Sequence, residues 1–173
     1  VDAIGGVEYN VPINMKYDDP TQDLHINLKA GIQKLDGDKA EQLLRFRHNN
    51  DGTSYSYEYG DNDFGRMRTQ RDFISELLKQ TLKPSNIFKL GDILDIAHKN
   101  VETNMSVSYL KDYLPYAVEF NTENLKNATL PVTTPGLNET NGVSVVLVDE
   151  DAAEELIQSM FFSDVVEVEE EAN

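Results

Sequence analysis

The segment from Phe64 to Lys83 most restricts what this chain can fold into, because its apolar residues recur with the spacing of one helical face. That stripe consists of Met67, Phe73, Ile74, Leu77, Leu78 and Leu82. Asp63 is placed to cap the start of the helix, and Pro84 ends it. An amphipathic helix is stabilised mainly by packing of its apolar face, so we expect the other elements to be built against it.

Strands are predicted on the N-terminal side of this helix. Residues 7–13 and 24–28 alternate between apolar and polar side chains, as half-buried strands do, and we expect them to pair as a hairpin. A short helix is expected over residues 38–44. The polar, tyrosine-rich residues 49–63 indicate a loop.

Elements of both kinds follow the long helix. We expect a helical stretch that is capped by Ser85 and continues to His98, and two further helices capped by Ser106 and Asp149. The strands expected in this part of the chain are 101–105, 125–131 and 143–148. Residues 163–173 carry only acidic charges and indicate a disordered tail. Strands that alternate with helices predict an α/β fold.

The chain is strongly acidic, with a net charge of −16 over 173 residues, yet all of its arginines lie between residues 45 and 71. Such a chain is a poor non-specific nucleic-acid binder, because that binding needs a broad basic surface. Clustered guanidinium groups, in contrast, are suited to bidentate binding of phosphate. The lack of cysteine excludes disulfides and thiolate metal sites, and no stretch of this sequence is long and apolar enough for a transmembrane helix or signal peptide.

Two polar residues lie on the apolar face of the long helix. On a helical wheel of about 100° per residue, Gln70 lies about 40° from Arg66 and Leu77 about 20° from it. A buried, unpaired guanidinium is costly, and a cation at a helix N-terminus is unfavourable, so Arg66 must contact an anion. That anion is either Asp61 or Asp63 of the protein itself, or a ligand phosphate.

Arg45 and Arg47 form a second group of positive charges. In an extended chain, residues two apart project to the same face, about 7 Å apart. Such charges repel each other unless an anion lies between them; the alternative is two surface arginines. With Arg66 they favour a pocket for phosphate or pyrophosphate, in which each charge-assisted hydrogen bond contributes about 1.5–3 kcal/mol. Arg68 is expected on the opposite, solvent-facing side of the long helix.

Other candidate groups are less specific. His48 is either an acid–base group or a histidine at the edge of a loop, and the second is favoured. Asp61 and Asp63, with Glu58, could bind Mg²⁺, although helix capping and ion pairing are favoured. The alternating tyrosines of residues 55–59 fit either a sugar-binding surface or a loop that packs on itself.

Several stretches resemble the LytR-CpsA-Psr family. They are VDAIGGVEYNVP (1–12), YDDPTQDLHINLKAGIQKLDGDKAEQLLRFRH (17–48), DFGRMRTQRDF (63–73) and NGVSVVLVDED (141–151). The resemblance extends over residues 1–162. It implies an α/β/α sandwich with a mixed central sheet, of which this chain is the C-terminal portion.

The resemblance also implies a function. The family's members are extracellular phosphotransferases of mainly Gram-positive bacteria, held at the outer face of the cell membrane by an N-terminal transmembrane helix. They move teichoic acid or capsular polysaccharide from a polyprenyl pyrophosphate carrier onto peptidoglycan. Arg45 and Arg47 match the family's R-x-R pair, and Asp63, Arg66 and Gln70 match its D-x-G-R-x-x-x-Q motif. By this match the first four are catalytic, and the three arginines with Gln70 bind pyrophosphate.

The match leaves some of the family's features outside this chain. The membrane anchor, a catalytic arginine and the metal-binding aspartates belong to an N-terminal half that has no counterpart here. We therefore expect no metal ligands in this chain, Mg²⁺ only in the full-length protein, and little or no turnover by the chain alone. Its unpaired sheet edges favour self-association. Thr69 stands where the family usually has an arginine, so one supporting contact is expected to differ.

Two other functions fit the same arginines. One is a non-catalytic protein that binds polyprenyl phosphate or another polyanion. The other is a transcriptional regulator, against which the acidic surface argues.

Overall fold

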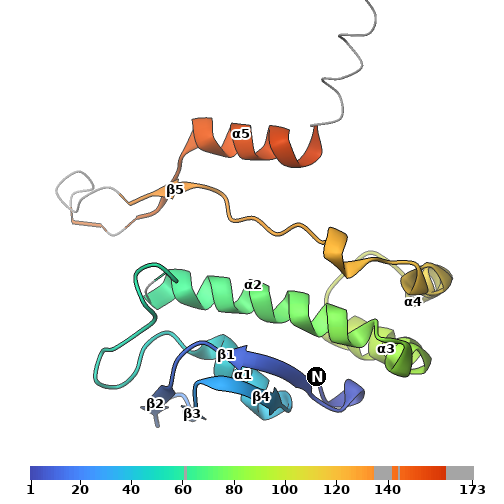
Figure 1. Ribbon diagram of the computed structural model, residues 1–173, viewed down its shortest axis with the longest axis horizontal. Coiled ribbons are helices and arrows are strands. Elements are labelled where there is room, and N and C mark those ends of the chain that lie inside the picture. Colours follow the sequence, from blue (N-terminus) through green and yellow to red (C-terminus); the bar gives the residue numbers. More distant parts are fainter. Residues whose placement is uncertain (61, 135–141, 144, 163–173) are drawn as a thin grey trace, which may run out of the picture. The chain divides into compact units, whose positions relative to one another are not determined.

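A computed structural model describes residues 1–60, 62–134, 142–143 and 145–162. The chain forms two compact units, Val1–Leu125 and Lys126–Asn173, and Figure 1 labels the α-helices and most of the strands. The predicted tail over 163–173 lies outside the described residues. Among the helices that are described, none is long and apolar enough to cross a membrane.

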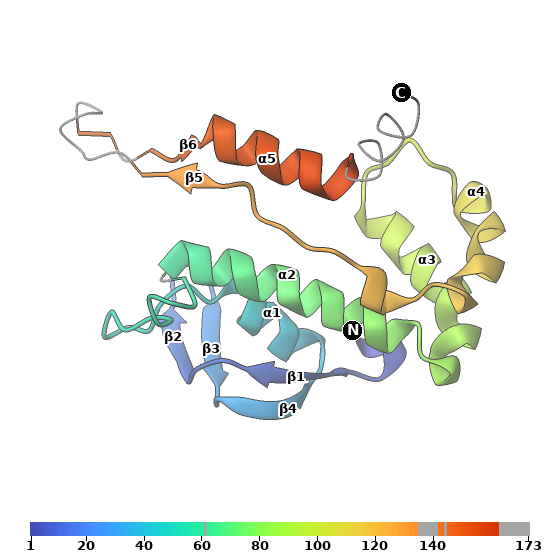
Figure 2. The same ribbon diagram turned by 45° about the horizontal axis from the view of Figure 1, so that its top comes forward.

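Four strands near the N-terminus form two antiparallel pairs (Figure 2). They follow a short 3-10 helix, η1 (Asp2–Ile4). Strand β1 (Val7–Val11) pairs with β4 (Gly31–Leu35), and β2 (Met15–Asp19) pairs with β3 (Leu24–Leu28). Alternate residues of β1 and β3 are buried, which confirms both predicted strands, but their predicted pairing is wrong. The prediction missed β2, because this polar strand has little apolar periodicity. Since β3 forms its hairpin with β2, strand β1 pairs with β4 instead.

Helix α1 (Gly37–Arg45) follows β4 and confirms the short helix predicted there. The carboxylate of Asp36 caps it by accepting a hydrogen bond from the backbone N–H of Lys39 at 2.9 Å. Ala40 and Leu43 are its buried residues, and the helix packs against β3, β4 and the next helix. The C-terminal end of α1 is therefore held at a fixed place beside the β2–β3 hairpin.

Helix α2 (Asn62–Thr81) confirms the long helix, but Asp63 lies in its first turn and not at its N-cap. The buried residues of α2 are Gly65, Thr69, Phe73 and Thr81. From the predicted apolar stripe, Phe73 and the partly buried Leu77 contact the core, whereas Met67, Ile74 and Leu78 are 46%, 49% and 39% exposed. The buried face of α2 therefore differs from the predicted apolar stripe. Small residues such as Gly65 and Thr69 let the rest of the unit approach the helix most closely, and hydrophobicity alone does not identify them.

The rest of the first unit is helical. It contains η2 (Pro84–Lys89), α3 (Leu90–Asn100), α4 (Val107–Asp112), η3 (Leu114–Val118) and η4 (Thr122–Asn124). Ser106 caps α4 as predicted, whereas Ser85 lies inside η2 and caps no α-helix. The strand predicted over 101–105 is wrong, since these residues form a loop between two helices.

The second unit contains β5 (Val132–Thr133), β6 (Leu147–Val148) and α5 (Glu150–Phe161). Asp149 caps α5 as predicted. The predicted strand 125–131 is wrong, because the chain becomes a strand only at Val132. Of the segment 143–148, residue 144 lies outside the described residues, and only the last two residues form a strand; they are exposed. The fold is α/β, and the strands that the structure describes form three antiparallel pairs and no mixed central sheet.

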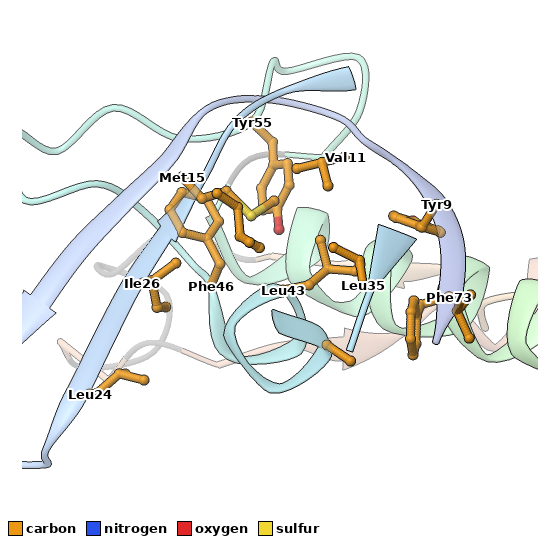
Figure 3. Packing of buried hydrophobic residues seen from close by; sticks show 13 residues of the cluster. Tyr9, Val11, Met15, Leu24, Ile26, Leu35, Leu43, Phe46, Tyr55 and Phe73 are labelled. Atoms are coloured by element: carbon orange, nitrogen blue, oxygen red, sulfur yellow. The ribbon is translucent and has the colours of Figure 1, made fainter. Parts of the chain in front are cut away.

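One apolar core occupies the first unit (Figure 3). Strands β1 to β4, helices α1 and α2, and the loop between these helices all contribute side chains to it. Phe46, directly after α1, is fully buried in it. Its ring meets that of Tyr55 edge to face, with 5.4 Å between the ring centres. Because Phe46 is anchored in this way, its neighbours Arg45 and Arg47 are held at the surface of the core.

Replacing Phe46 with alanine is expected to lower the free energy of unfolding by about 3–5 kcal/mol, the usual effect of removing a buried phenylalanine. Phe88→Ala is the matched control, because Phe88 is 94% exposed, and a change within about 0.5 kcal/mol is expected there. Urea unfolding followed by circular dichroism measures both. Equal effects of the two substitutions would contradict the burial of Phe46.

Candidate functional site

Three arginines line one cavity of about 260 Å³ in the first unit. Arg45 comes from the end of α1, Arg47 from the segment after it, and Arg66 from the first turns of α2. The β2–β3 hairpin closes the other side with Tyr17, Gln22 and Leu24, and His48 completes the lining. The volume lies just below the roughly 300–1,000 Å³ found for small-molecule sites, so it suits a headgroup better than a polymer.

Arg45 and Arg47 reach the same cavity although the chain between them is not a strand. Arg45 is the last residue of α1, and Phe46 has extended backbone angles of φ −65° and ψ 135°. With Phe46 buried, the residues on either side are directed away from the core, as the sequence argument expected of an extended segment. Arg45 also contacts Glu41 at 3.1 Å, an exposed pair that contributes little to stability.

Asp63 lies between Arg47 and Arg66. Its Oδ1 is 2.5 Å from Nη2 of Arg66 and 3.9 Å from Nε of Arg47. The ion pair that the sequence offered as one partner for Arg66 is therefore present; Asp61, the alternative, lies outside the described residues. The buried Nε of Arg66 makes no hydrogen bond with any described residue. A buried donor without an acceptor is unfavourable, so this atom favours binding of an anion from outside the protein.

Gln70 does not line the cavity with the arginines. Its Nε2 donates a hydrogen bond of 2.8 Å to the carbonyl oxygen of Leu44, in the last turn of α1. Carbonyls at the end of a helix have no partner within the helix, so this bond satisfies one of them and joins α1 to α2. The contact fixes the residue before Arg45. The predicted role of Gln70 in binding pyrophosphate stays a prediction.

Gly65 is a site residue that the sequence argument missed. A Cβ atom at this position would lie 2.1 Å from the carbonyl oxygen of Gly60 and 2.2 Å from the ring of Tyr55. Only glycine therefore lets the loop and the first turn of α2 meet. The nearest sequence signal was its place between Asp63 and Arg66, but nothing in the sequence alone identified Tyr55 as its neighbour.

The tyrosines of the loop have two different environments. Tyr55 is buried and stacks on Tyr59 with 5.1 Å between ring centres, whereas Tyr57 is 88% exposed. Burial raises the pKa of Tyr55 to about 12, so this phenol is neutral at neutral pH. Of the two alternatives for these residues, packing of the loop on itself describes Tyr55 and Tyr59.

Arg68 and Thr69 attach this loop to α2. Arg68 is exposed on the solvent-facing side of α2 as predicted, and its guanidinium lies over the ring of Tyr59, 4.5 Å from its centre. Thr69 is fully buried, and its hydroxyl is 2.9 Å from the hydroxyl of Tyr59. A large arginine would not fit this place without moving the loop, which explains why threonine stands here.

The cavity does not fit Mg²⁺. This ion needs a near-octahedral set of oxygen ligands, usually with one or two carboxylates. Three guanidinium groups line the cavity, and the adjacent carboxylate of Asp63 is already held by two of them. No group of three or more histidine, aspartate or glutamate side chains elsewhere among the described residues is placed to hold a metal ion.

Comparison with known proteins adds to this geometry. The model of the LytR_cpsA_psr family matches residues 1–161 of the chain. The chain belongs to the LytR-CpsA-Psr family. The match runs through both motifs that line or support the cavity, the R-x-R pair and the D-x-G-R segment.

Two relatives of the chain have names of different kinds, one of a transferase and one of a regulatory protein. The chain is 34% identical over 112 residues to the polyisoprenyl-teichoic acid–peptidoglycan teichoic acid transferase TagU of Bacillus cereus, which covers 65% of this chain and 32% of the relative. It is 30% identical over 112 residues to the biofilm regulatory protein A of Streptococcus mutans, which covers 62% of this chain and 25% of the relative. The chain thus spans about a third or less of these relatives.

A solved structure of the family shares the fold. The crystal structure of TagV from Bacillus subtilis superposes with a TM-score of 0.65 at 22% identity, over 92% of this chain and 56% of that one. This likeness confirms the α/β class.

Gly65→Ala is expected to lower the free energy of unfolding by about 1–3 kcal/mol, because the added methyl group overpacks the contact with Tyr55 and Gly60. Gly91→Ala is the matched control, since it lies in α3 with nothing within 4 Å of an added Cβ, and alanine there is expected to stabilise the helix by about 0.5–1 kcal/mol. Chemical unfolding measures both changes. A neutral Gly65→Ala would contradict the close approach.

Asp63→Asn is expected to lower the melting temperature, because Arg47 and Arg66 then face each other without a carboxylate. Inorganic pyrophosphate is expected to raise the melting temperature of this variant more than that of the wild type, since the ligand replaces the lost charge. Glu76→Gln is the control, because Glu76 forms an ion pair with Lys79 at the same spacing on the same helix. Equal shifts in all three proteins would contradict an anion site beside Asp63.

Proposed function

We propose that this chain supplies the pyrophosphate-binding part of a cell-wall glycopolymer phosphotransferase. The observation that carries the proposal is the cavity with three arginines, in which the buried Nε of Arg66 has no acceptor among the described residues. Membership of the LytR-CpsA-Psr family and the transferase names of its relatives support it. The substrate would be a teichoic acid or capsular polysaccharide on a polyprenyl pyrophosphate carrier, and the acceptor peptidoglycan.

The roles of the side chains follow from their positions. Arg45, Arg47 and Arg66 would bind the pyrophosphate oxygens and stabilise the charge that develops on them during transfer. Asp63 would hold Arg47 and Arg66 in place, and Gln70 would hold the end of α1. Preorganised positive groups of this kind act most strongly when they do not have to move during the reaction.

The rest of the reaction is a proposal for the full-length protein. The proposed carrier and the peptidoglycan acceptor are both at the outer face of the cell membrane, so we place the protein there. A dependence on Mg²⁺ would need ligands outside the residues described, because the cavity itself does not fit the ion. Pyrophosphate binding without any transfer by the full-length protein would instead favour a binding protein.

Removal of two arginines tests the proposal. Calorimetric titration of the chain with a short polyprenyl pyrophosphate is expected to show binding that Arg45→Ala/Arg47→Ala weakens by at least about 100-fold. Two lost charge-assisted hydrogen bonds, at about 1.5–3 kcal/mol each, account for that factor. Circular dichroism of each variant verifies that it is folded.

The control has to remove the same charge elsewhere. Lys79→Ala/Lys83→Ala takes two cations from exposed positions at the far end of α2 and beyond it, and should leave the affinity within about threefold. A similar loss in both double variants would show non-specific attraction of an anion. Unchanged binding in the arginine variant would show that the ligand is bound elsewhere.

A further inference from the structure

His48 is the one residue of the cavity lining with an imidazole ring, the side chain most often used as a general acid or base. It follows Arg47 in the chain and is half-buried. Its ring meets Tyr17 edge to face, with 5.4 Å between ring centres and 89° between ring planes. The imidazole is therefore packed against β2 and is not a freely rotating group at a loop edge.

One nitrogen of the His48 ring has a fixed partner. Nδ1 lies 2.9 Å from the backbone carbonyl oxygen of Asn49. A carbonyl oxygen only accepts hydrogen bonds, so Nδ1 must carry the hydrogen in the neutral ring. The lone pair is then on Nε2, so Nε2 is the ring nitrogen that can take a proton.

The partner itself is held rigidly. The backbone N–H of Asn49 donates to the carbonyl of Thr53 at 2.7 Å, and its side-chain Nδ2 donates to the Thr53 hydroxyl at 2.8 Å. Its Oδ1 accepts a hydrogen bond of 2.6 Å from the backbone N–H of Lys16 in β2. Asn49 therefore joins the loop to the hairpin and sets the direction of the carbonyl that orients His48.

We propose that His48 is the general base that takes the proton of the acceptor hydroxyl during transfer. The inference rests on the proposed function. The hydroxyl oxygen forms a bond to the phosphorus that carries the glycopolymer, the bond from this phosphorus to the bridging oxygen breaks, and polyprenyl phosphate leaves with that electron pair. The hydroxyl proton passes to Nε2 of His48 and from there to the departing phosphate or to water. The three arginines hold the anion, and His48 takes the proton, which a guanidinium without a lone pair cannot accept.

The variant His48→Asn tests this role. The asparagine amide can still donate to the Asn49 carbonyl, but it has no basic nitrogen in place of Nε2. In the full-length protein we expect the turnover number to fall by about 100-fold or more, the usual contribution of a general base. The KM and the affinity for pyrophosphate should stay within about threefold. His98→Asn, at an exposed position of α3, should leave all of these values unchanged.

A second measurement concerns the ring itself. Long-range proton–nitrogen NMR of the imidazole in the 173-residue chain is expected to show Nδ1–H and an unprotonated Nε2 for neutral His48. A hydrogen on Nε2 in the neutral ring would overturn the proposal. So would a His48→Asn protein whose turnover number is within threefold of the wild type, or one that loses pyrophosphate binding as well, which indicates a structural role.

The outcomes separate this inference from the function on which it rests. If the arginine variants lose pyrophosphate binding and the wild-type protein transfers glycopolymer, failure of His48→Asn to slow turnover overturns only the role of His48. If the wild-type full-length protein shows no transfer, the proposed function and the role of His48 both fail.

Discussion

The contact between the ring of Tyr55 and the backbone of Gly65 determines where the arginines meet. It joins the loop after α1 to the first turn of α2, and no side chain larger than hydrogen fits at residue 65. Arg66 directly follows this glycine, while the other end of the loop begins next to Arg47. Because the loop is fastened at this point, two segments from different helices contribute to one cavity.

The electrostatics of the cavity depend on the carboxylate of Asp63. Three guanidinium groups so close together repel each other, and Asp63 offsets part of that repulsion by contacting Arg47 and Arg66. Even with Glu41, which contacts Arg45, two carboxylates do not neutralise three cations, so the cavity keeps positive charge in a chain of net charge −16. An anionic headgroup such as pyrophosphate completes the balance, which a neutral sugar does not. Because the cavity is positive and the rest of the surface is mainly negative, an anion is attracted to this one place on the molecule.

Much of the site could be predicted from the sequence, for reasons that can be named. The spacing of Arg45 and Arg47, two residues apart, predicted that both lie on one face of an extended segment, and the position of Arg66 near a helix start required an anion. Gln70 was assigned to the ligand because it matches the family's motif, and its angle on the helix places it near Arg66, but the wheel gives a direction and not a neighbour. The end of α1 lies within hydrogen-bonding distance, and its free carbonyl at Leu44 takes the amide.

The sequence by itself determined the local elements and the charge pattern: the strands β1 and β3, the helices α1 and α2, the Ser106 cap of α4, the Asp149 cap of α5, and the confinement of arginine to one stretch. These follow from interactions between residues close in the chain. The tertiary structure alone decided that β1 pairs with β4, which face of α2 is buried, and that Tyr17 and His48 share a cavity with the arginines. Such choices depend on the fit of surfaces far apart in sequence, and periodicity carries no information about which surface lies opposite.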